Sequence, residues 1–161
     1  QKDEVYIARW LRPSPNFVGD PNPGGNKSLM LEWHANNVVV GSIYFNYETS
    51  PDPLQNINIA SCITRDARND KSLGRNRAST PIVRGTWGLW EYYVKMNTPG
   101  VANGIIRGWC NGVLQFEYTD WTFLRAGEFG KFTQLKSDFY ENRAQLFPMW
   151  WDMDHMFVSG R

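Results

Sequence analysis

One histidine and two tyrosines are the side chains of this sequence best suited to proton transfer. His34, Tyr44 and Tyr93 stand at polar positions in segments where polar and apolar residues alternate. Removal of a proton beside a carboxylate would use His34 or Tyr93 as the base and Tyr44 as the acid, with a cation to neutralise the carboxylate. The candidate cations are Arg9, Lys95 and Arg107. The alternative for a single histidine in a strand is a structural or merely exposed side chain.

Carbohydrate binding needs a different mixture of side chains. Flat aromatic rings stack on the C–H faces of sugars, while amides and charged groups pair with sugar hydroxyls. The candidate ligand-binding residues are Arg9, Glu32, Asn58, Glu91, Lys95, Arg107 and Trp109. The alternative is that these positions form the ordinary solvated side of a sheet.

A period of two predicts that these residues lie on β-strands. The predicted strands are 4–11, 28–35, 38–46, 56–63, 87–97, 104–110, 113–118 and 154–159. Asn111-Gly112 predicts a tight antiparallel hairpin, because both residues tolerate positive φ. Helical periodicity is nearly absent, and only 136–145 weakly predicts a turn or two of helix. The pattern therefore predicts an all-β sandwich or barrel.

The inward positions of these strands are apolar. The predicted core residues are Leu29, Leu31, Trp33, Ile43, Phe45, Ile57, Ile59, Ile63, Trp90, Tyr92, Val94 and Met96. Each second residue between them would face solvent or a groove.

Composition excludes some functions and leaves others open. The 161 residues suit a single domain spanning 1–161. The chain opens with Gln1, so we expect a processed chain or a piece of a longer one. Lys plus Arg number 17 and Asp plus Glu 16, a balance that argues against nucleic acid as a partner. No apolar run approaches the roughly 20 residues that span a bilayer.

The two cysteines leave two arrangements open. Cys62 and Cys110 both fall in predicted strands, and their spacing fits no metal motif. They would form either a disulfide between the sheets or two separate buried thiols.

Two segments are candidate contacts for other protein chains. The segment 64–84 carries six basic and two acidic residues, and would meet an acidic polysaccharide, meet a neighbouring subunit, or lie in solvent. The cluster Phe147-Pro148-Met149-Trp150-Trp151 would form a contact patch if exposed, or would cover the open edge of the sandwich.

The segment 85–112 carries a family resemblance. It contains Gly85-Thr86-Trp87, Glu91, Val94-Lys95-Met96-Asn97, Asn103-Gly104 and Trp109 before Asn111-Gly112. This order resembles the meander of concanavalin A-like jelly rolls of the polysaccharide-lyase and laminin-G kinds, with a strand W-x-x-x-E-x-x-V-K-x-N followed by N-G and W-x-N-G. Gly24-Gly25-Asn26-Lys27 and Asp154-His155-Met156-Phe157-Val158-Ser159 resemble other parts of that fold. The resemblance implies a two-sheet antiparallel jelly-roll sandwich.

The resemblance does not fix the activity, because this superfamily contains lyases, glycosidases, lectins and adhesion modules. The alginate-lyase strands R-x-E-x-R, Q-x-H and Y-x-K-x-G-x-Y are missing, and Glu32 replaces the glutamine expected two residues before His34. The glycosidase pattern E-x-D-x-E is also missing. Asp154 stands where several of these jelly rolls place a ligand to structural calcium, with Asp152 nearby, although calcium takes about six or more oxygens. Asp154 would otherwise cap a turn or meet an arginine.

Three functions follow from these observations. The first expectation is polysaccharide binding on the concave face of the sandwich, with no required cofactor. The second is a lyase that cleaves uronic-acid polymers by β-elimination. The third is a structural or decoration module of a particle or virion surface. All three place the protein outside cells or on a cell or particle surface.

Overall fold

The computed structural model describes residues 2–17, 26–48, 57–66, 71–73, 81–141 and 148–161. Side chains are described for the same ranges except for 26, 46–48, 57–66, 71–73, 81–82 and 138–141. The strands are β1 (Glu4–Pro13), β2 (Asn26–Ala35), β3 (Val38–Glu48), β4 (Ile57–Asp66), β5 (Lys71–Leu73), β6 (Pro81–Ile82), β7 (Gly88–Lys95), β8 (Gly104–Cys110), β9 (Val113–Trp121), β10 (Gly130–Glu141) and β11 (Trp151–Gly160). Within these ranges no helix is long and apolar enough to cross a membrane.

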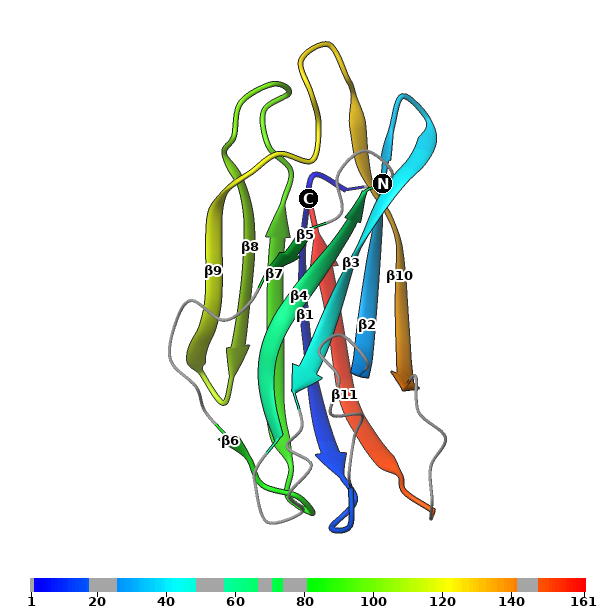
Figure 1. The fold of residues 1–161 in the computed structure, drawn as a ribbon, viewed down its shortest axis with the longest axis vertical. Helices are drawn as coiled ribbons and strands as arrows, with labels where there is room; N and C mark the ends of the chain where they lie inside the picture. Colours follow the sequence, from blue (N-terminus) through cyan, green and yellow to red (C-terminus); the bar gives the residue numbers. More distant parts are fainter. Residues whose placement is uncertain (1, 18–25, 49–56, 67–70, 74–80, 142–147) are drawn as a thin grey trace.

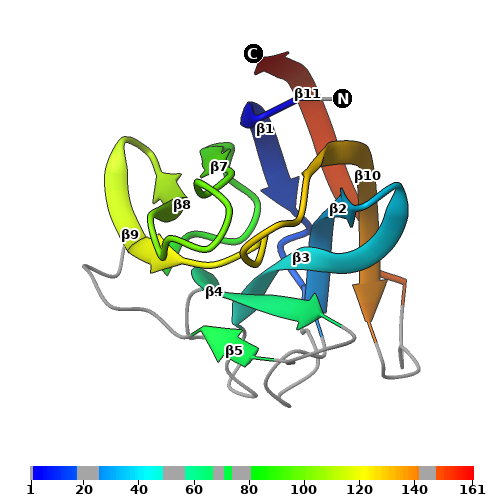
Figure 2. The ribbon, with the colours of Figure 1, turned by 90° about the horizontal axis from the view of Figure 1, so that it is seen from above.

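The strands form two antiparallel sheets that face each other (Figures 1 and 2). One sheet has five strands in the order β11-β1-β7-β8-β9. The other has six, in the order β10-β2-β3-β4-β5, with β6 also paired to β4. The predicted all-β, two-sheet antiparallel sandwich is confirmed.

The core lies between the sheets because each strand turns one set of alternating side chains inward. Trp33, Phe45, Trp90 and Tyr92 are fully buried there. Most core rings pack edge to face or tilted, as in Trp33 on Phe123 with ring centres 5.3 Å apart, whereas Phe45 and Phe116 are stacked. The predicted core is confirmed wherever side chains are described, and Ile57, Ile59 and Ile63 lie outside that part.

All eight predicted strands are present, but β10 was missed. The helical turn predicted for 136–145 is wrong, because β10 pairs with β2 as far as Glu141. Bulges between Phe132 and Gln134, and between Ser137 and Tyr140, interrupt that pairing. A bulge sets two residues of one strand against one of the next, so inward Phe132 and Leu135 stand three apart and imitate a helical period.

Two hairpins turn on residues with positive φ. Asn111 and Gly112 have φ of 49° and 76° between β8 and β9, so the predicted hairpin is confirmed. Asn36 and Asn37 have φ of 53° and 65° between β2 and β3. Asparagine tolerates this region better than most residues, which explains the second turn without glycine.

Cys110 is a free, fully buried thiol at the end of β8. It is therefore not joined to Cys62, whose side chain lies outside the described part. Burial raises the pKa of Cys110 to about 12, so the thiol is protonated at neutral pH.

Candidate functional site

Two rows of side chains, polar except for Met30, cross the outer surface of the six-stranded sheet. Lys136 pairs with Met30, which pairs with Tyr44. One row along, Gln134 pairs with Glu32, which pairs with Ser42. Directly paired residues share a face of the sheet, and the neighbours of these residues are the buried core positions. We call this surface, together with Lys27, the tyrosine-lysine face.

Ionic and aromatic contacts hold these side chains in place. The Lys136 ammonium lies 3.2 Å from Glu32 Oε1, and the Glu32 side chain is only 16% exposed. The Lys27 ammonium lies 5.3 Å from the centre of the Tyr44 ring, in cation–π contact. Groups carried by paired strands are held more rigidly than groups on loops. The face therefore offers two ammonium groups, a carboxylate, an amide, a hydroxyl and a phenol in fixed positions.

His34 lies farther along β2, two residues beyond Glu32 on the same side of the strand. It pairs with Lys131 and lines a hollow of about 410 Å³ at one end of the sandwich, together with Asp3, Asn37 and Phe129. Met30, the strand partner of Tyr44, is four positions from His34. At the rise of a strand this is about 13 Å, so His34 and Tyr44 are not neighbours on the sheet.

Tyr93 belongs to the opposite surface of the molecule. Its hydroxyl donates to Glu4 Oε2 at 2.7 Å, and burial together with this hydrogen bond raises the pKa of Tyr93 to about 12. A phenol with that pKa keeps its proton at neutral pH and is a poor base. Tyr93 therefore does not meet His34 and Tyr44 in one catalytic site, because outward residues of facing sheets lie on opposite surfaces.

Most of the predicted ligand-binding residues share the surface of Tyr93. Glu91 pairs with Trp109 and Tyr93 with Arg107 across β7 and β8, and Lys95 ends β7. Arg107 Nε donates to Glu117 Oε1 at 2.8 Å, and Glu91 accepts a hydrogen bond from Tyr6. These residues cannot act together with Glu32 on one ligand.

Arg9 is a correction to the sequence prediction. The predicted surface cation is fully buried between the sheets, where it donates to Ser28 Oγ at 2.9 Å and Ser137 Oγ at 3.0 Å. Burial lowers the pKa of Arg9, while attraction from the neighbouring Tyr92 hydroxyl opposes that shift. Its contacts make it part of the core and remove it from any surface site.

The other predicted site residues are only partly described. Asn58 lies on β4, and its side chain is outside the described part, as are most of 64–84 and Phe147. Trp150 is exposed, whereas Met149 and Trp151 pack against the core. The cluster that ends at Trp151 thus covers one end of the core and leaves one ring in solvent.

The two aspartates proposed for calcium already contact neighbouring side chains. Asp152 forms an ion pair with Arg12, and Asp154 contacts the next residue, His155. Within the part of the chain that the structure describes, no three acidic, histidine or cysteine side chains gather as metal ligands. The pair fits a calcium site poorly, because six or more oxygens are needed, and calcium remains an untested prediction.

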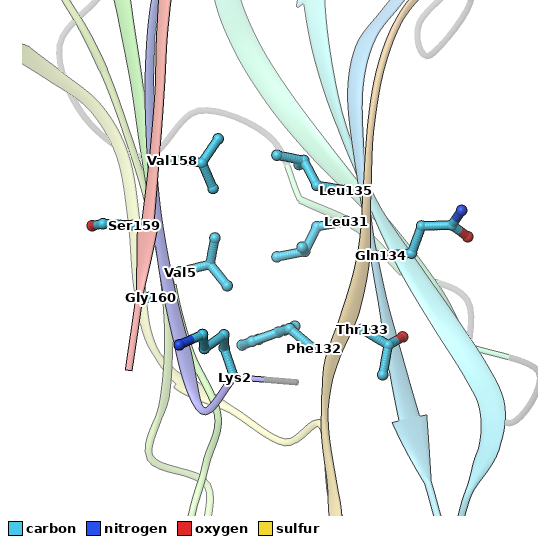
Figure 3. A pocket seen from close by; sticks show the side chains of 10 residues that line it. All are labelled: Lys2, Val5, Leu31, Phe132, Thr133, Gln134, Leu135, Val158, Ser159 and Gly160. Carbon is cyan, nitrogen blue, oxygen red and sulfur yellow. The ribbon is translucent and has the colours of Figure 1, made fainter.

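A second hollow opens between the sheets at the edge formed by β10 and β11. Figure 3 shows Val5, Leu31, Leu135 and Val158 pointing into it, whereas Gln134 and Ser159 point away. Its volume is about 340 Å³. The apolar lining has no acid–base pair, so it offers no catalytic chemistry.

Sequence reasoning missed Lys136 and Gln134, although both lie on the tyrosine-lysine face. They were missed because β10 was not predicted. Without this strand, neither residue could be paired with a neighbour on β2. The sequence did contain a signal for this strand. If a bulge is assumed between Phe132 and Leu135, both apolar residues face inward and the segment fits a strand.

No protein-family model matches this sequence, and no curated protein matches it. Solved structures do match in fold. The alginate lyase Aly36B is 14% identical with a TM-score of 0.71, over 98% of this chain and 69% of that one. An alginate lyase of family PL-14 from Aplysia kurodai is 10% identical with a TM-score of 0.63, over 99% and 70%. The endo-β-1,4-glucuronan lyase of the fungus Trichoderma reesei is 13% identical with a TM-score of 0.59, over 99% and 69%.

The chain has a concanavalin A-like jelly-roll fold. The fold inferred from the meander motif is thereby confirmed. At these sequence identities the similarity supports a shared fold but does not transfer the roles of individual residues. The function of this jelly roll must therefore be argued from its own side chains.

Proposed function

We propose that this jelly roll binds an acidic polysaccharide across the tyrosine-lysine face. The observation that carries the proposal is the pairing of two rows across β10, β2 and β3, which with Lys27 bring two ammonium groups and one carboxylate together among the side chains that the structure describes there. An ammonium group pairs with a sugar carboxylate, and the amide, hydroxyl and phenol groups suit sugar hydroxyls.

The dimensions of the face favour a polymer over a single sugar. Three neighbouring strands span about 10 Å, and two rows on one strand add about 7 Å. A surface of this size is wider than one sugar ring.

The fold likeness supports a uronic-acid polymer as the ligand class. Aly36B has been solved in complex with alginate trisaccharide, and another match is a glucuronan lyase. We extend only the class of ligand to this chain, because the cations of the tyrosine-lysine face suit it. Such polymers are met outside cells, which is where we place the protein.

Binding measurements on matched lysine variants test the proposal. The double variant Lys27→Gln/Lys136→Gln should bind alginate oligosaccharides at least tenfold more weakly than the unmodified protein by isothermal titration calorimetry. Lys95→Gln removes an exposed positive charge on the opposite surface and should leave the affinity unchanged. Equal affinities for all three proteins, or no binding of alginate or glucuronan, would refute the proposal.

A lyase is the second candidate, favoured by the position of Tyr44 beside Lys27. In β-elimination the C5 proton is removed, the glycosidic oxygen leaves and is protonated, and a C4–C5 double bond forms. Lys27 or Lys136 would neutralise the uronate carboxylate, and the Tyr44 hydroxyl would exchange the proton. This assignment does not use His34 or Tyr93.

Ultraviolet absorbance of the unsaturated product decides between binding and cleavage. An increase during incubation with alginate or glucuronan that Tyr44→Phe abolishes would make the protein a lyase. Retained binding without any increase would make it a binding module. Neither binding nor cleavage would favour the structural or decoration module.

A further inference from the structure

A second surface of this protein gathers exposed tryptophans. Trp10, Trp87 and Trp150 are 40%, 40% and 44% exposed, although tryptophan is among the most buried residue types on average. They come from β1, from the residue before β7 and from the residue before β11. We call this surface, with Arg12 and Asp152, the tryptophan face.

Arg12 fixes two of the three rings. Its guanidinium carbon lies 5.1 Å from the ring centre of Trp87 and 5.3 Å from that of Trp150, so it is held by both. Trp10 precedes Arg12 by two residues on β1 and points to the same side, about 7 Å along the strand. The rings are therefore close enough for one short oligosaccharide to reach them together.

The charge of Arg12 is offset within the tryptophan face by Asp152, and Asp154, the strand partner of Trp10, adds a further carboxylate. Arg12 Nε donates to Asp152 Oδ2 at 2.8 Å, and a second nitrogen of the same guanidinium also contacts that oxygen. Farther across the same sheet, Arg107 pairs with Glu117. The surface thus offers aromatic faces beside a neutralised ion pair, unlike the tyrosine-lysine face with its excess of ammonium groups.

We propose that the tryptophan face is a second carbohydrate site, which takes a neutral polysaccharide. The apolar C–H faces of pyranose rings stack on Trp10, Trp87 and Trp150, and sugar hydroxyls meet the polar edges of Arg12 and Asp152. A neutral ligand fits because Asp152 offsets the charge of Arg12 and Asp154 adds a carboxylate beside Trp10, so the described part of this face has no surplus Lys or Arg to attract an acidic ligand. This site lies on the five-stranded sheet and does not depend on the function proposed for the other sheet.

Native affinity electrophoresis with two neutral polymers tests this site. Hydroxyethyl cellulose and galactomannan are cast separately into gels, and the mobility of each protein is compared with a gel without polymer. Trp87→Ala and Trp150→Ala should each weaken retardation by roughly tenfold, whereas Trp150→Phe should keep part of it. Phe129→Ala is the matched control, because Phe129 is a 59% exposed aromatic residue near the hollow that His34 lines.

The expected result is retardation that depends on the tryptophans and is unchanged by Phe129→Ala and by Lys27→Gln/Lys136→Gln. Thermal unfolding of each variant checks that the fold is retained. Absence of retardation in both gels, or equal retardation in all variants, would overturn the inference. Concentration-dependent self-association that Trp150→Ala abolishes would also overturn it and would indicate a second copy of the chain as the occupant.

Discussion

Asn97 is the residue with the densest set of side-chain hydrogen bonds at the end of β7. It is buried, its Nδ2 donates to the carbonyl oxygens of Val101 and Leu124 at 3.0 and 2.8 Å, and its Oδ1 accepts from the backbone of Phe123 and Leu124. Removing such a group leaves several buried backbone groups unsatisfied. Asn97→Ala should therefore lower the free energy of unfolding by about 3 kcal/mol in urea titrations. A loss below 1 kcal/mol, similar to that for exposed Asn103→Ala, would contradict this role.

Arg9 is a residue whose direction could be predicted from the sequence but whose burial could not. It alternates with the buried residues Ile7 and Leu11, so the period of two indicates an inward position. Because arginine is charged, we predicted a surface position instead. Its burial beside serine hydroxyls could not be predicted, because these serines lie on the opposite sheet and the packing of the two sheets was unknown. We predict that Arg9→Ala lowers the free energy of unfolding by about 3 kcal/mol, because it opens a cavity and leaves the buried Ser28 hydroxyl without this donor. Exposed Arg125→Ala should change it by less than about 0.5 kcal/mol, and equal losses for the two variants would argue against a core role.

Tyr6 and Tyr93 give the protein a pH dependence in the alkaline range. Burial, followed by hydrogen bonds to Glu91 and Glu4, raises the pKa of each from 10.0 to about 12. A pKa that is higher in the folded state means that the stabilisation is complete below pH 10 and is lost as the pH rises toward 12. Tyr6→Phe/Tyr93→Phe should therefore lose less stability than the unmodified protein over this interval. Identical pH profiles of the unfolding midpoint would show that these phenols do not contribute.

Gly112 sets the geometry of the β8–β9 hairpin, an element that the sequence predicts well. Its φ of 76° is unfavourable for other residues, while a Cβ at this position would meet no atom within 4 Å. Gly112→Ala should therefore lower stability by about 1 kcal/mol through backbone conformation alone. Asn37→Gly at the other positive-φ hairpin should be neutral or stabilising. Stabilisation by Gly112→Ala would contradict the assigned turn.

β10 is the strand that the local pattern of polar and apolar residues did not predict. Its two bulges exist because β2 fixes its register, and that partner lies about a hundred residues earlier in the chain. Without β10, Gln134 and Lys136 of the tyrosine-lysine face were missing from the predicted site. Strands such as β7 and β8 were predictable because their alternation is uninterrupted and a two-residue turn fixes the pairing of β8 with β9.

At the scale of the whole molecule, the two sheets present different chemistry on their outer surfaces. The six-stranded sheet carries ammonium groups around Tyr44, whereas the five-stranded sheet carries tryptophans and paired charges. The meander motif predicted the sandwich, and alternation predicted which residues point outward. Neither could divide the outward residues between the two surfaces, because that division depends on strand order, and strand order brings β11 beside β1 and β10 beside β2. Residues predicted as one site therefore separate into two surfaces and the core.

The central claim is that an acidic polysaccharide lies across β10, β2 and β3. Amide NMR titration of the labelled protein with alginate oligosaccharides tests it most directly, because every strand is read in one experiment. The account predicts the largest shift changes at Met30, Glu32, Tyr44 and Lys136, with little change at Tyr93, Arg107 and Trp109. Changes confined to Tyr93, Arg107 and Trp109, or to Trp10 and Trp87, would contradict it.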